Sequence, residues 1–142
     1  MSNFFSFILE RKEQILSLLV EHTFLTMLAI ALAILIGIPL GILITNIKPL
    51  RKPILGLINT LQAVPSMALL GLLIPLLGIG TVPAITTVVL YSLLPIVKNT
   101  FTALTNIDEN MLEAARGMGL TKRQTLIKIK IPVSLPLIMS GV

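Results

Sequence analysis

The sequence contains no cysteine, one histidine (His22) and six acidic residues among its 142. The absence of cysteine excludes disulfides, thiolate nucleophiles and cysteine-based metal sites. With so few acids and a single histidine, we expect no metal site and no catalytic residues, and we interpret His22 as a polar residue at a membrane edge. A membrane enzyme is therefore the least favoured class.

Charge is also scarce, because charged residues make up 12% of the chain, against about 25% in a typical soluble domain. Hydrophobic residues make up 55%, and the mean hydropathy is +0.99. The chain cannot cover itself with polar surface, which predicts an all-α integral membrane protein. The net charge of +5 comes from Lys and Arg scattered over short segments without interleaved aromatics, so we expect no nucleic-acid partner.

Four apolar segments are expected in the membrane, each judged against the roughly 20 helical residues that cross a bilayer. The first covers residues 22–45 without an acid, Lys or Arg. Residues 54–79 and 82–98 follow as a hairpin joined by the turn sequence "GIGTVP". The fourth segment, 131–142, would rise only about 18 Å, so the chain is expected to be truncated within it.

The basic residues predict the orientation of these segments. Lys and Arg gather in the first turn (residues 46–53) and in a long polar insert (residues 105–130), while the hairpin turn has none. The positive-inside rule places the first turn and the insert in the cytoplasm and the N-terminus outside. Residues 1–21 are expected to form an uncleaved interfacial segment, and residues 22–142 a single transmembrane domain.

The insert is predicted to fold as a helix, a sharp turn and a second helix. Asp108 and Glu109 suit a helix start, and Gly119 suits its end. Thr121 and Gln124 have the spacing of a capping box at the start of the next helix.

Small and charged residues lie together in the first of these helices. Ala114 and Ala115 would let it lie deep in a partner's groove, with Glu113 and Arg116 at the rim. The alternative is a solvated loop with helical propensity, and the physics of the residues leaves both open.

The spacing of the insert resembles a known motif. Glu113-Ala114-Ala115, Gly119, Ile129 and Pro132 match the EAA pattern of permeases in binding-protein-dependent ABC importers, with Ile131 in place of the usual Leu. The resemblance implies a multi-helix permease core whose coupling helix docks on an ATP-hydrolysing subunit. The residues implied in coupling are Glu113, Ala114, Ala115, Arg116, Gly119, Ile129 and Pro132.

The same resemblance implies partners. These are the ATPase subunit that binds ATP and Mg, a second permease chain, identical or homologous, an extracytoplasmic substrate-binding protein and the lipid bilayer of a bacterial plasma membrane. This chain has no phosphate-binding G-x-x-x-x-G-K-[ST] motif, so we expect it neither to hydrolyse ATP nor to hold a cofactor.

Residues 61–104 are similar to permeases for osmoprotectants such as glycine betaine, carnitine and choline. Quaternary ammonium ions are held over aromatic faces, yet aromatics make up only 4% of this chain. Tight recognition is therefore expected from the separate binding protein. The alternatives are a permease for amino acids or another small solute, and a truncated fragment that does not transport.

Polar residues within the apolar segments are the candidates for a translocation path. Polar side chains at membrane depth turn toward the bundle interior or a water-filled cavity. Interhelical hydrogen bonding without solute contact is the alternative, and Pro65 and Pro95 are candidate pivots. The path candidates are Asn59, Gln62, Ser66, Thr87, Tyr91 and Ser92.

Overall fold

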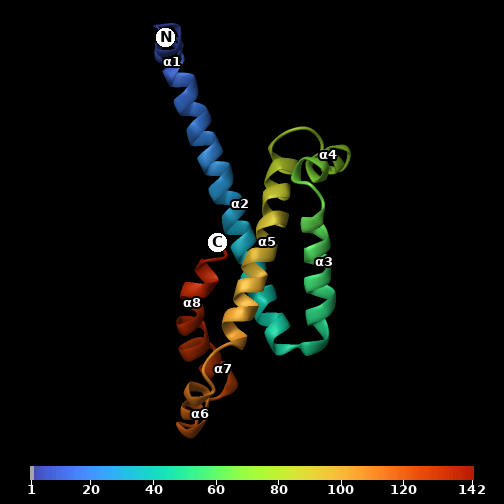
Figure 1. The fold of residues 1–142 in the computed structure, drawn as a ribbon, viewed down its shortest axis with the longest axis vertical. Coiled ribbons are helices and arrows are strands. Elements are labelled where there is room, and N and C mark those ends of the chain that lie inside the picture. Colours follow the sequence, from blue (N-terminus) through green and yellow to red (C-terminus); the bar gives the residue numbers. More distant parts are fainter. Residues whose placement is uncertain (1) are drawn as a thin grey trace.

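The computed structural model describes residues 2–142, with side chains described from Ser6 onward. The described residues form helices and turns without strands, which confirms the all-α prediction. Figure 1 shows α5 in the centre, with α2, α3 and α8 around it. The elements are α1 (Ser2–Glu10), α2 (Lys12–Asn46), η1 (Lys48–Leu50), α3 (Arg51–Ala63), α4 (Ser66–Leu77), α5 (Thr81–Thr105), α6 (Glu109–Gly117), α7 (Lys122–Thr125), η2 (Leu126–Lys130) and α8 (Ile131–Met139).

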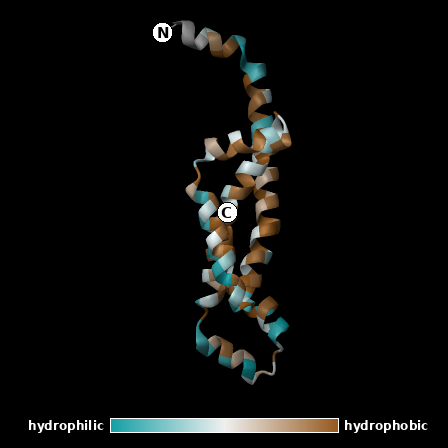
Figure 2. Cartoon of the chain, turned by 90° about the vertical axis from the view of Figure 1, so that its right-hand side faces the viewer, coloured by the Kyte–Doolittle hydropathy of each residue, from teal (hydrophilic) through white to brown (hydrophobic). Residues whose placement is uncertain are grey.

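Helices α2 and α5 are each long and apolar enough to cross a membrane. Helix α2 has 35 residues and is therefore about 52 Å long, well beyond the roughly 30 Å of a bilayer core. It begins at Lys12, so residues 12–21 continue the spanning helix, and the expected boundary after residue 21 is not a structural break. Figure 2 shows hydrophobic residues along the bundle, with hydrophilic residues at the end that carries the insert and toward the N-terminus.

The expectation that residues 54–79 form one spanning helix is wrong. The structure has two helices there, α3 and α4, which meet at an angle of 99°. Pro65 has no N–H and disfavours a helical conformation in the preceding residue, and Val64 is extended, with ψ at 128°. The proline expected to act as a pivot therefore ends α3.

The hairpin turn is confirmed, because Gly78 and Gly80 both have positive φ, at 83° and 142°. Helix α5 then runs to Thr105, two turns beyond the end expected at residue 98.

Small residues bring α2 and α5 close together. Ala29, Ala33, Gly37 and Gly41 recur every four residues on α2, and all are buried. A Cβ on Gly37 would lie 2.7 Å from Cγ2 of Ile96, and one on Gly41 would lie 2.5 Å from Cβ of Thr100. This is the small-xxx-small packing of membrane helices, in which the two backbones approach closely.

Arg51 closes the turn between α2 and α3. Its Nε donates to the carbonyl of Ile44 and its Nη2 to that of Thr45, both at 2.8 Å. These carbonyls belong to the last turn of α2, which has no helical donors for them. The guanidinium also lies 5.1 Å from the ring centre of Phe101 on α5, so one side chain ties three helices together.

Candidate functional site

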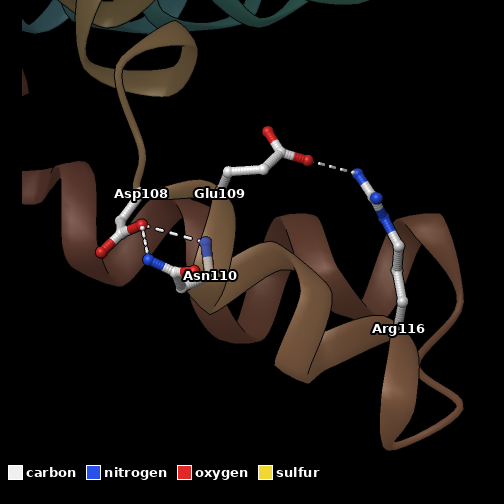
Figure 3. A network of polar contacts seen from close by, with 4 residues as sticks. All are labelled: Asp108, Glu109, Asn110 and Arg116. Atoms are coloured by element: carbon white, nitrogen blue, oxygen red, sulfur yellow. Dashed lines mark hydrogen bonds and ion pairs between the residues drawn. The ribbon is translucent and has the colours of Figure 1, made fainter.

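The first helix of the insert, α6, is capped at its start by Asp108. The Oδ1 of Asp108 accepts from the backbone N–H of Asn110 at 2.9 Å and from the side-chain amide of Asn110 at 3.0 Å (Figure 3). An acidic cap satisfies a free N–H group and complements the helix dipole. The predicted helix start is confirmed.

Gly119 makes the sharp turn that ends α6. Its φ is +75°, and its N–H donates to the carbonyl of Arg116 at 2.9 Å. The N–H of Leu120 donates to the carbonyl of Ala115 at 3.1 Å, which completes a Schellman motif. The predicted helix end is thus confirmed, and it depends on a conformation that favours glycine.

The capping box that starts the next helix is confirmed as well. The N–H of Thr121 donates to Oε1 of Gln124 at 2.9 Å, and the N–H of Gln124 donates to Oγ1 of Thr121 at 3.3 Å. Both helices of the insert are therefore fixed at the turn between them, so the insert has a defined shape.

The outer face of α6 differs in part from the expectation. Glu113 and Ala114 are exposed, but Ala115 is fully buried within the chain, so the two alanines do not share the outer surface. Helical residues one apart point about 100° away from each other, and only one of them can face outward here. Arg116 pairs with Glu109 at 3.0 Å (Figure 3). Glu109 lies seven residues before Arg116 in the sequence, one helical turn before Glu113.

Ile129 and Pro132 lie where the insert joins the membrane segment. Helix α7, η2 and α8 form one continuous helical run from Lys122 to Met139, and η2 is a π-helical turn. Within it the N–H of Ile131 donates to the carbonyl of Leu126, five residues back. In a regular helix the ring of Pro132 would clash with the carbonyl of Lys128, and the wider turn relieves that clash. The two residues thus mark the joint between the insert and α8.

The path candidates do not share one helical face. Asn59 and Gln62 lie on α3, whereas Ser66 lies on α4, beyond the 99° break. The i, i+3, i+7 spacing holds only within a continuous helix, so the expected stripe is wrong for Ser66. Asn59 and Ser66 are exposed in this chain.

The candidates on α5 are more buried. Thr87 is buried and donates from Oγ1 to the carbonyl of Pro83 at 2.8 Å, within its own helix. Ser92 is half-buried one residue after Tyr91.

Gln62 and Tyr91 connect the break between α3 and α4 to the middle of α5. The side-chain Nε2 of Gln62 donates to the backbone carbonyl of Tyr91 at 3.1 Å. The hydroxyl of Tyr91 bonds to the carbonyl of Val64, at the end of α3. For these two residues the structure favours interhelical hydrogen bonding over a free position on a path.

Pro95 explains why this connection forms. The carbonyl of Tyr91 would normally accept from the N–H of residue 95, and proline has none. The carbonyl of Val64 lies at the end of α3 and likewise lacks a helical donor. Each helix therefore supplies the donor that the other one needs.

Comparisons with known proteins agree with this architecture. The chain is 47% identical over 141 residues to the osmoprotectant import permease OsmW of Salmonella typhimurium, covering 96% of this chain and 66% of that protein. It is 41% identical over 122 residues to the carnitine transport permease OpuCB of Listeria monocytogenes, covering 86% of this chain and 56% of that one. The chain thus spans less than two thirds of the length of either relative.

Among solved structures, the chain resembles one from the inward-facing MetNI methionine ABC transporter. The TM-score is 0.71 with 24% sequence identity, over 82% of this chain and 61% of that one. This likeness concerns the fold. The family model for the inner membrane component of binding-protein-dependent transport systems matches residues 33–142, and the chain belongs to that family.

Proposed function

We propose that the chain is the permease subunit of an ATP-driven importer and that α6 is its coupling helix. The observation that carries the proposal is the exposed face of Glu113 and Ala114 on a helix capped at both ends. A fixed helix with a small residue outward fits a groove in a partner. That partner would be the ATPase subunit, which binds ATP and magnesium.

The way the insert joins the membrane segment supports this role. Motion of α6 reaches α7 through the Gly119 turn, and α7 continues into α8 without a break. A displacement at the ATPase would therefore move a membrane helix. The chain would act with a second permease chain in the plasma membrane of a bacterium, with its N-terminus outside.

We infer that the solute is an osmoprotectant or a related quaternary amine such as glycine betaine, carnitine or choline. The names of both relatives support this class. Within the described side chains four aromatic residues are present, and the rings of Phe7 and Phe101 already lie against Arg11 and Arg51, which leaves Phe24 and Tyr91 for a cage. Tight recognition would then belong to an extracytoplasmic binding protein, with a transient site in the permease.

Uptake of labelled glycine betaine, choline and carnitine, measured with the cognate binding protein and ATPase, tests the solute class. We expect uptake of at least one of these compounds to exceed that of labelled amino acids. Amino-acid uptake without quaternary-amine uptake would assign a different permease class.

Co-purification tests the coupling helix separately. Ala114→Trp should reduce the yield of bound ATPase subunit, because the bulky side chain occupies the docking face. Lys52→Trp, at an exposed position in the first turn, is the control and should retain the ATPase. Equal retention in both variants would place the docking surface elsewhere.

A further inference from the structure

A cavity of about 730 Å³ lies between the insert and the end of α2. Four cationic residues line it: Arg116, Lys122, Arg123 and Lys130. Among its described lining residues there is no acid. Arg116 is paired with Glu109 outside the lining, which leaves three cations around the cavity without an ion pair in the described part of the chain.

Like charges around one cavity repel each other, and an anion between them removes that repulsion. The donors present suit a phosphate group. An arginine guanidinium can bind two phosphate oxygens at once, and a lysine adds a mobile point charge. Asn46, at the end of α2, also lines the cavity, and its side-chain amide is a neutral donor.

The cavity also has apolar walls, formed by Leu112, Leu120 and Leu126. Its place along the bundle is defined by Asn46, the last residue of α2, and by Lys130, which directly precedes α8. Both positions are where apolar helical segments end, and lipid headgroups lie at that level. A ligand with a phosphate and an apolar part fits both kinds of wall.

We propose that this cavity binds the headgroup phosphate of an anionic phospholipid, with Lys122, Arg123 and Lys130 around the phosphate and the leucines along the lipid's apolar part. The site is separate from the face that carries Glu113 and Ala114, since neither residue lines the cavity. The inference goes beyond coupling and holds for a permease of any solute.

Native mass spectrometry of the full chain in neutral detergent tests the proposal, with phosphatidylglycerol, phosphatidylcholine and inorganic phosphate as probes. The cavity variant is Arg123→Gln with Lys130→Gln. The control variant is Lys48→Gln with Lys52→Gln, which removes the same charge from the first turn, outside the cavity.

We expect the unaltered chain to retain phosphatidylglycerol in preference to phosphatidylcholine. The cavity variant should bind phosphatidylglycerol about twenty-five-fold more weakly, at about five-fold per removed charge, while the control changes less than about three-fold. Each single variant should show about a five-fold loss, which keeps the test decisive if the double variant does not fold.

Three results would overturn the proposal. Equal losses in the cavity and control variants would mean that the lipid senses only the overall surface charge. Equal retention of both lipids by the unaltered chain would remove the anion requirement. Displacement of phosphatidylglycerol by an equal concentration of inorganic phosphate would identify free phosphate as the ligand in place of a lipid.

Discussion

The side-chain Nε2 of Gln62 lies 3.1 Å from the backbone carbonyl of Tyr91 and donates to it a hydrogen bond that Pro95 cannot supply. A proline within a membrane helix is tolerated when a neighbouring helix satisfies the freed carbonyl. Here the neighbouring helix is α3, which ends just before Pro65. The break at Pro65 and the proline in α5 are therefore linked.

Gln62→Ala should destabilise the chain by about 1 kcal/mol, because the carbonyl of Tyr91 loses its donor. The cost should fall close to zero in a Pro95→Ala background, where residue 95 regains an N–H for the same carbonyl. A double-mutant cycle of unfolding free energies in detergent measures this coupling. Additive effects of the two changes would contradict the linkage.

Gly41→Ala should destabilise the α2–α5 contact by about 1–3 kcal/mol, because its Cβ would lie 2.5 Å from Cβ of Thr100. Gly56→Ala is the control, since a Cβ at Gly56 on α3 meets nothing within 4 Å. Thermal unfolding of the two variants should separate them. A stable Gly41→Ala variant would show that the helices do not pack this closely.

Gly119→Val should lower solute-stimulated ATP hydrolysis in the assembled transporter while membrane insertion stays normal. The open space around Gly119 means that the effect comes from its φ of +75°, which a β-branched residue rarely adopts. Gly117→Val is the control, because Gly117 has equally open space without a positive φ. Full stimulation in the Gly119 variant would argue against a coupling role for this turn.

Arg51→Lys should destabilise the chain by about 1–2 kcal/mol even though the charge is kept. A lysine cannot donate to the Ile44 and Thr45 carbonyls in the same fork geometry, and it loses the planar contact with Phe101. The neighbouring exposed Lys52→Gln should change stability little. Unfolding midpoints compared between the two variants check this, and equal midpoints would mean that Arg51 acts only through its charge.

Local signals in the sequence predicted the insert well. Asp108, Gly119, Thr121 and Gln124 each act through bonds to residues a few positions away, so their spacing alone indicates the caps. The burial of Ala115 could not be predicted in this way, because it depends on which face of α6 packs against the rest of the chain.

The structure of the membrane segments was harder to predict, because it depends on contacts between residues far apart in the sequence. Residues 54–79 contain no charged residue, and hydropathy does not distinguish one straight span from two helices meeting at 99°. Pro65 was the available signal for the break. The four-residue spacing of Ala29, Ala33, Gly37 and Gly41 was a visible signal for close helix packing, whereas the partners Ile96 and Thr100 are set by tertiary structure.

The glycine contacts between α2 and α5 have a mechanical consequence. No lipid chain fits between backbones that leave no space for a methyl group at Gly37 or Gly41. The two helices therefore pack as one unit. Residues 106–108 alone separate the end of α5 from the start of α6. A force applied at α6 should therefore displace α2 and α5 together.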